Sequence, residues 1–162
     1  MRRVVTGHDE RGRAIVLIDG EAANRRTSAS GNSSTTMWCT DAMPADIAIG
    51  NGVEDMGARI LGTPPPPNGT RFTVNQIVPG SAAVMHRTES LDYAIVISGE
   101  IDMDLDEGSV HLQAGDVVIQ RGTNHAWANR GTAPAVIAFV LIDALPLGIG
   151  EPVLRGESVR PK

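Results

Sequence analysis

Hydrophobic and polar residues alternate in short runs along the second half of the chain, from Arg71 onward. The runs are separated by turn residues and read FTVNQIV, DYAIVI, EIDMDL, SVHLQ, DVVIQ and AVIAFVLI. In EIDMDL, Ile101 and Met103 fall on one face of an extended strand, and Asp102 and Asp104 fall on the other. Short alternating runs with turns between them predict an antiparallel sandwich or barrel.

The first seventy residues carry a different and less regular pattern. Residues 3–6 and 13–18 predict two strands of a hairpin, joined by the turn GHDERG. Residues 20–36 are small and polar and predict a mobile loop. Residues 35–40 predict a strand, and PPPPNG at 64–69 predicts a stiff extended segment followed by a turn.

These patterns predict one domain in three parts. Residues 1–70 form an N-terminal extension of strands, loop and Pro-rich segment that packs on the barrel, and residues 71–145 form the barrel core. Residues 146–162 form an irregular tail, which we expect to pack across the barrel or onto a partner subunit. With no repeat of the whole unit in the sequence, we expect one barrel per chain.

Composition narrows the class of protein further. With 162 residues, 41% of them hydrophobic, the chain is long enough for one packed core, and at 3% aromatic content that core is aliphatic. The net charge of -5 argues against a nucleic-acid partner. The sequence has no apolar run of about 18 residues, which argues against a membrane helix. No signal-peptide pattern follows the basic N-terminus, so we expect a cytoplasmic protein.

The candidate chemistry lies in two segments. PGSAAVMHRTESLDYAIVISGE contains His86, Thr88 and Asp92, and GDVVIQRGTNHAWAN contains His125 and Trp127. Residues two apart in a strand share a face, so the first three are predicted to point one way and the last two to share a second face. Imidazoles and a carboxylate inside a small barrel are costly unless they are paired, protonated or bound to a metal.

The first segment resembles the first motif of the cupin superfamily. That motif reads Gly, five residues, His-x-His, three or four residues, Glu, six residues, Gly. Here Gly80 and His86 have the required spacing, and Gly99 closes the motif. Thr88 stands in place of the second His, and Asp92 stands in place of the Glu.

The second segment resembles the end of the second cupin motif, Pro-x-Gly-x-x-His-x-x-x-Asn. Gly122, His125 and Asn129 match it, and Gln120 stands in place of the Pro. The spacing from Gly115 is one residue short. The resemblance covers residues 71–142 and implies an all-β, cupin-type double-stranded β-helix, or jelly-roll barrel, with an N-terminal strand extension. It also implies a homodimer, formed by exchanging or adding edge strands.

For the site, the resemblance implies a divalent iron, manganese, zinc or nickel ion held by His86, Asp92 and His125. Thr88 is a poor metal ligand and would hydrogen-bond a metal-bound water or a substrate oxygen. Such an ion would act as a Lewis acid in lyase, isomerase, dehydratase or decarboxylase chemistry, or in dioxygenase chemistry. The implied substrate is a small organic acid, enol or polyketide-like molecule.

Other interpretations stay open at this point. A chain with two of four ligands exchanged could have lost its metal and could use His86, Asp92 and His125 for acid–base catalysis, or only bind a small ligand. In a structural interpretation, His86 would hydrogen-bond Asp92, and His125 would stack on Trp127. We also expect Gln76, Gln120 and Trp127 to line the pocket.

Overall fold

The computed structural model describes residues 1–50 and 52–159, and nearly all of its regular structure is strand. Eleven strands and one 3₁₀ helix are described. The strands are β1 (Arg2–His8), β2 (Ala14–Glu21), β3 (Arg25–Thr27), β4 (Ser33–Thr40), β5 (Thr70–Ile77), β6 (Ser90–Ser98), β7 (Glu100–Leu105), β8 (Ser109–Gln113), β9 (Val117–Arg121), β10 (His125–Ala128) and β11 (Ala135–Asp143). The 3₁₀ helix is η1 (Met56–Ala58).

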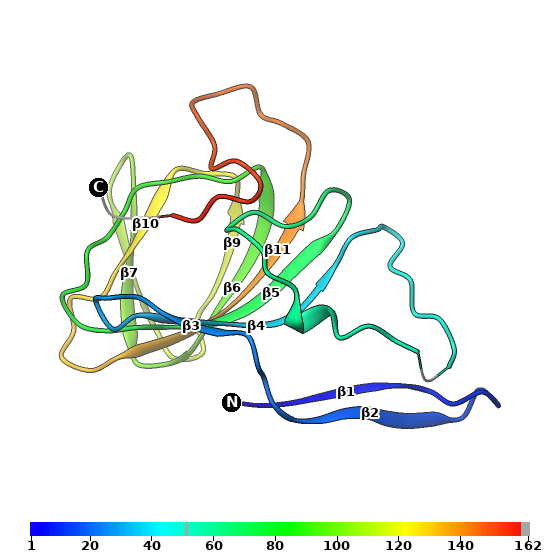
Figure 1. The fold of residues 1–162 in the computed structure, drawn as a ribbon. Coiled ribbons are helices and arrows are strands. Elements are labelled where there is room, and N and C mark those ends of the chain that lie inside the picture. The colour runs from blue at the N-terminus through cyan, green and yellow to red at the C-terminus, as the bar shows by residue number, and fades with distance from the viewer. Residues whose placement is uncertain (51, 160–162) are drawn as a thin grey trace.

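The strands form two sheets that curve around a common interior, and a hairpin that stands apart (Figure 1). The larger sheet has the order β3-β4-β5-β11-β6-β9, and the smaller has the order β10-β7-β8. All their pairings are antiparallel. Figure 1 shows β7 and β10 of the smaller sheet on one side of this interior and β5, β11 and β6 of the larger sheet on the other. The predicted all-β jelly-roll fold is therefore confirmed.

The N-terminal hairpin of β1 and β2 is joined to the rest of the chain by a partly buried ion pair. The Arg3 guanidinium donates to the Asp55 carboxylate, with Nη2 2.6 Å from Oδ2, and to the carbonyl oxygen of Met37 at 3.0 Å. Arg3 is only 9% exposed, whereas the Asp55 side chain is 32% exposed, so the arginine is the shielded partner of this pair.

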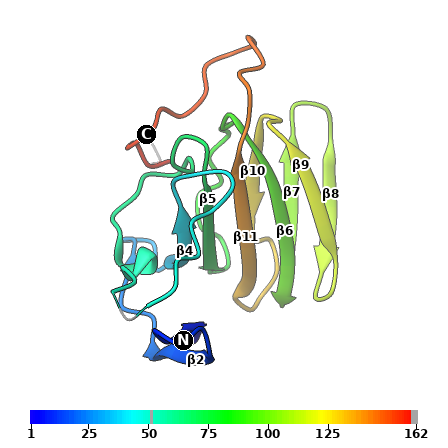
Figure 2. The same ribbon diagram turned by 90° about the vertical axis from the view of Figure 1, so that its right-hand side faces the viewer.

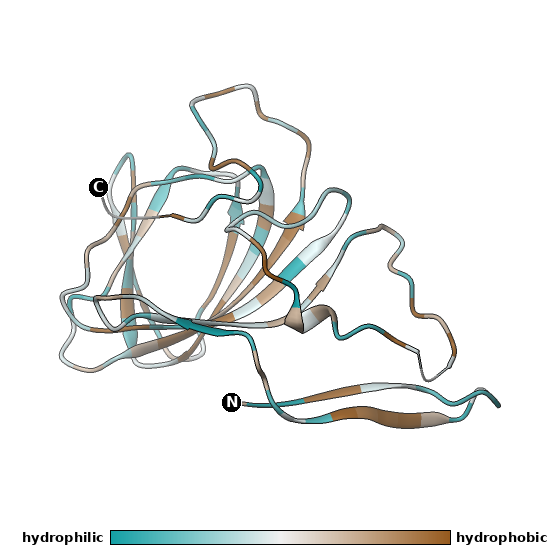
Figure 3. Cartoon of the chain, viewed as in Figure 1, coloured by the Kyte–Doolittle hydropathy of each residue, from teal (hydrophilic) through white to brown (hydrophobic). Residues whose placement is uncertain are grey.

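The main hydrophobic core lies between the sheets. It contains Ile77, Ala94, Val96, Ile101, Met103, Leu112, Ala135, Ile137, Phe139 and Leu141. Figure 3 shows hydrophobic residues, in brown, along the strands that surround the interior. Ile101 and Met103 are 1% and 3% exposed, as the alternation in EIDMDL predicts. The turn before this strand needs Gly99, which has φ of 76°, and an added Cβ there would lie 2.7 Å from the carbonyl oxygen of Pro134.

The prediction of a mobile loop over residues 20–36 is wrong. This stretch contains β3 and part of β4, which join the larger sheet beside β5. Its serines and threonines suit a strand whose two faces are both covered, because Thr is β-branched and hydroxyls can face a polar interior. Thr35 and Thr36 are both only 6% exposed.

The C-terminal tail has no regular secondary structure from Leu145 to Val159 and folds back toward the barrel (Figure 2). The Thr63 amide donates to the carbonyl oxygen of Glu157 at 2.7 Å, and the Val159 amide donates to Thr63 Oγ1 at 3.1 Å. The tail is thereby held against residues 61–63. Among residues 1–50 and 52–159, no helix is long and apolar enough to span a membrane.

Candidate functional site

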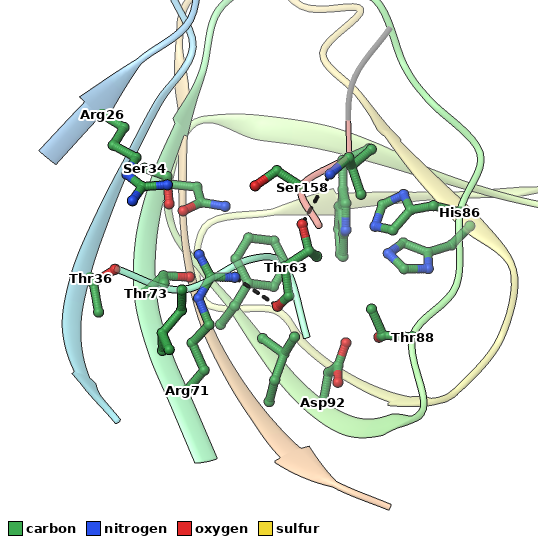
Figure 4. Close-up of a pocket in the computed structure, with 17 residues that line it drawn as sticks. Arg26, Ser34, Thr36, Thr63, Arg71, Thr73, His86, Thr88, Asp92 and Ser158 are labelled. Carbon is green, nitrogen blue, oxygen red and sulfur yellow. Dashed lines mark hydrogen bonds between the residues drawn. The ribbon is translucent and has the colours of Figure 1, made fainter. Parts of the chain in front are cut away.

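A cavity of about 290 Å³ lies inside the barrel, and its lining includes residues from the N-terminal strands, the barrel and the C-terminal tail (Figure 4). Its walls come from strands β3, β4, β5, β6, β10 and β11, with His86 and Thr88 from the segment before β6. Leu61, Thr63, Ser158 and Val159 add the loop before β5 and the tail. Two chemically different ends face each other across it.

A pair of imidazoles forms the first end. The backbones of His86 and His125 exchange two hydrogen bonds of 2.9 and 2.8 Å, and this bridge brings the ring centroids to 4.3 Å. Each Nδ1 lies against a main-chain carbonyl oxygen, that of Val84 at 2.9 Å for His86 and that of Thr123 at 3.0 Å for His125. A carbonyl oxygen only accepts, so Nδ1 carries the proton and Nε2 keeps a lone pair.

Burial keeps both imidazoles neutral. It lowers the pKa of His86, and together with a smaller effect from the nearby His86 it lowers the pKa of His125 to about 4. At neutral pH the two Nε2 atoms are therefore hydrogen-bond acceptors and bases.

Asp92 lies at the same end and is held by two hydroxyls. Ser90 donates to Asp92 Oδ1 at 2.5 Å, and the hydroxyls of Thr88 and Ser90 are 2.7 Å apart. Because the Ser90 proton goes to Asp92, Thr88 donates to Ser90 and keeps its own lone pairs free. Burial raises the pKa of Asp92 to about 6, although the Ser90 hydrogen bond opposes the shift.

The three-residue metal centre expected from sequence is not assembled. Within residues 1–50 and 52–159, no group of three His, Cys, Asp or Glu side chains could hold a metal ion. The imidazoles come together, but Asp92 is one methylene shorter than Glu and its Oδ1 is held by Ser90. The two imidazole Nε2 atoms are suitable metal ligands, but no third side chain of the described residues completes a metal site with them.

The structural interpretation of the two histidines is wrong for His86. Its Nδ1 contacts the carbonyl oxygen of Val84 rather than Asp92. His125 does pack on Trp127, edge to face with ring centroids 6.0 Å apart, and Trp127 packs in the same way on Phe139 at 5.2 Å. Trp127 lines the cavity, as expected.

The structure does not bring Gln76 and Gln120 into the cavity lining. Gln76 is on the face of β5 opposite to Asn75, because side chains alternate along a strand. Gln120 pairs in register with Asp92 and is 2% exposed, so it is buried on the same side of the sheet without reaching the cavity wall. Its amide nitrogen has no hydrogen-bond partner among the described residues.

Sequence reasoning missed the second end of the cavity. Arg71, Thr73 and Asn75 of β5 line it together with Ser34 and Thr36 of β4. The sequence TRFTVNQI contains a pattern that could have predicted this end. Arg71, Thr73 and Asn75 are spaced two residues apart, so they share one polar face of the strand. The apolar half, including Val74, packs instead in a second cluster with Ala22, Met37 and Ala138.

The fold and the cavity define a small β-sandwich protein with a polar internal site. The family model described as the cupin domain matches residues 74–142. The chain is 34% identical over 160 residues to the "Phomopsin biosynthesis cluster protein C'" of Diaporthe leptostromiformis, covering 95% of this chain and 84% of that protein. It is 34% identical over 151 residues to the "Cupin-domain-containing oxidoreductase fogC" of Aspergillus ruber, covering 87% of this chain and 71% of that protein.

A solved structure agrees with the fold alone. An RmlC-like cupin from Shewanella frigidimarina superposes with a TM-score of 0.50 at 12% identity, covering 77% of this chain and 87% of that chain. The chain belongs to the cupin superfamily, as the two motifs predict.

Proposed function

We propose that the chain is a small-molecule enzyme that removes a proton from a substrate held in the barrel cavity. The observation that carries the proposal is the imidazole and carboxylate end, where His86, His125 and Asp92 offer three proton acceptors at neutral pH. The names of the similar proteins, a biosynthesis cluster protein and an oxidoreductase, support an enzyme.

Asp92 is the proposed general base. Its pKa of about 6 is closer to neutral pH than the pKa of about 4 of His125, and a base works best when its pKa is near the working pH. Its Oδ2 has no hydrogen-bond partner among the described residues, while Ser90 holds Oδ1. The imidazole Nε2 atoms would accept hydrogen bonds from substrate hydroxyls and orient the substrate. Isomerisation, dehydration and decarboxylation can each follow such a proton transfer, whereas an oxidation would also need an electron acceptor.

Solvent exchange tests this function without knowledge of the final product. Small ketones, enols and organic acids would be incubated with the protein in D₂O, and loss of C–H signal would be followed by proton NMR. We expect at least one compound to exchange, with a rate that falls about 100-fold or more in Asp92→Asn. The matched control, Glu107→Gln, removes an exposed carboxylate and should keep the parent rate. Equal rates in the parent and Asp92→Asn would contradict the proposal.

A second candidate function keeps the same cavity and adds a divalent transition metal. The two free Nε2 atoms of His86 and His125 favour it, and Asp92 would have to leave Ser90 to complete the set. Elemental analysis of protein purified without added metal or chelator tests it. Near-stoichiometric iron, manganese, zinc or nickel that is lost in both His86→Ala and His125→Ala would support this candidate. A parent that binds none of these metals even after reconstitution would reject it.

A further inference from the structure

Two arginines line the cavity at the end opposite the imidazoles, and neither has a carboxylate partner among the described residues. Arg71 comes from β5 and Arg26 from β3 (Figure 4). None of the ion pairs within residues 1–50 and 52–159 includes either of them. The other arginines that point into the fold, Arg3 and Arg87, each have an acidic partner.

Arg71 is the more deeply placed of the two. Its Nη1 donates to the carbonyl oxygen of Thr63 at 2.8 Å, and its Nε is buried without a hydrogen-bond partner in the described part of the chain. Burial, with a smaller effect from the charge of Arg26, lowers the pKa of Arg71 to about 10, so the guanidinium is still protonated at neutral pH. A buried charge with no counter-ion destabilises a fold, which makes an unpaired guanidinium a sign of a missing anionic ligand.

The surroundings of Arg71 are those of an anion subsite. Thr73 and Asn75 follow it on the same face of β5, and Thr36 and Ser34 lie beside them on the neighbouring strand β4. Hydroxyl and amide groups can donate to an anion beside the planar fork of the guanidinium. Among residues 1–50 and 52–159, Asp92 is the only carboxylate that lines the cavity, so none of these residues adds a negative charge at the arginine end.

We propose that Arg71, assisted by Arg26, binds the carboxylate of an organic acid whose reactive end lies at His86, His125 and Asp92. This inference rests on the proposed function, because it names the class of substrate for the same cavity. Trp127, Phe139 and Leu141 line the wall and give the acid an apolar surface, which suits a short unsaturated or aromatic body. The volume of about 290 Å³ is at the small end of ligand pockets, which span about 300–1,000 Å³.

The subsite can be tested by binding alone. Acetate, sorbate and benzoate, each with its methyl ester, would be titrated into the protein and followed by NMR and Trp fluorescence. An acid that bonds to a charged guanidinium should bind at least about tenfold tighter than its ester in the parent. This preference should fall to about one in Arg71→Met and to an intermediate value in Arg71→Lys, which keeps the charge without the fork.

Two controls separate the subsite from other effects. Arg121→Met removes an exposed arginine outside the cavity and should keep the acid preference of the parent. Arg11→Met removes a second exposed arginine outside the cavity and should keep it as well. Absence of an acid preference for all three pairs in the parent, or the same preference in Arg71→Met, would overturn the anion subsite. Neither result would affect the exchange test with Asp92→Asn, so the two proposals can fail separately.

Discussion

The charge state of Asp92 is the feature on which the chemistry depends at the scale of single residues. Its carboxyl is 5% exposed, and burial is the main reason that its pKa is raised from 3.8 to about 6. A carboxyl whose folded pKa is raised stabilises the fold below pH 3.8, and this contribution is lost as the pH rises through about 6. The ionised base is therefore retained at a cost in stability.

Replacing Asp92 by Asn should stabilise the protein at high pH only. A shift of about two units, at 1.36 kcal/mol per unit, gives a gain of about 3 kcal/mol in unfolding free energy at pH 8, which fades below pH 4. Urea denaturation at the two pH values measures the difference. A gain of the same size at both pH values would show that packing, and not charge, is responsible.

His125 should have the opposite pH dependence. Its pKa in the folded protein is about 4, below the ordinary 6.5. The stability that the neutral imidazole contributes to the fold is therefore present above pH 6.5 and is lost as the pH falls through about 4. Between pH 7 and pH 4, the free energy of unfolding of His125→Gln should fall by about 3 kcal/mol less than that of the parent. The difference between the two denaturation series isolates His125, since Asp92 titrates in both proteins. Parallel losses in the two proteins would mean that His125 titrates as an exposed histidine does.

At the scale of elements, the loop at residues 61–63 and the tail are in direct backbone contact. A Cβ added to Gly62 would lie 2.3 Å from the carbonyl oxygen and 2.7 Å from the amide nitrogen of Glu157. Because both atoms belong to the main chain, the tail would have to move. This contact positions Ser158 and Val159, which line the cavity.

Gly62→Ala should therefore loosen the tail while the barrel stays folded. We expect the Thr63 and Val159 amides to exchange with D₂O faster by about tenfold or more, with little change in the core strands. The matched control is Gly20→Ala, where an added Cβ meets nothing within 4 Å. Unchanged protection of both amides in Gly62→Ala would mean that the tail is not held by this contact.

The alternation of polar and apolar residues predicted where the strands lie in the sequence, but it did not always predict which face of a strand points into the barrel. In β7 the apolar residues Ile101 and Met103 face the core, because that part of the interior is dry. In β5 the inward face is Arg71, Thr73 and Asn75, because that part of the interior is a polar cavity. A period of two identifies two faces but does not say which one is inside. For the same reason Gln76, in phase with Val74, was expected in a pocket that it does not line.

The proximity of His86 and His125, which are far apart in the sequence, could be predicted only from the two cupin motifs. The resemblance to cupins brought His86 and His125 together, and the structure confirms their proximity at a ring distance of 4.3 Å. The hydrogen bond that holds Asp92 depends on the rotamer of Ser90, which no sequence pattern encodes.

At the scale of the whole molecule, net charge and local charge differ in sign. The chain carries a net charge of -5, yet one end of its cavity holds Arg26 and Arg71. A negative surface argues against nucleic acid as a partner but does not prevent the binding of a small acid inside the barrel. The charge that matters for substrate selection is therefore that of the cavity wall.

The homodimer expected from sequence stays a prediction. Light scattering coupled to size exclusion would measure it, and we expect twice the chain mass of 17.1 kDa. A mass of one chain across the accessible concentration range would contradict it.

The most direct test of the proposed function is the pH dependence of the exchange reaction catalysed by the parent protein. The rate constant kcat/KM for deuterium incorporation, measured from pH 5 to pH 8 on the fastest compound of the screen, should rise through a midpoint near pH 6 as Asp92 ionises. In Asp92→Asn this rise should disappear together with most of the rate. A profile without a transition near pH 6, or the same profile in Asp92→Asn, would contradict the assignment of Asp92 as the base.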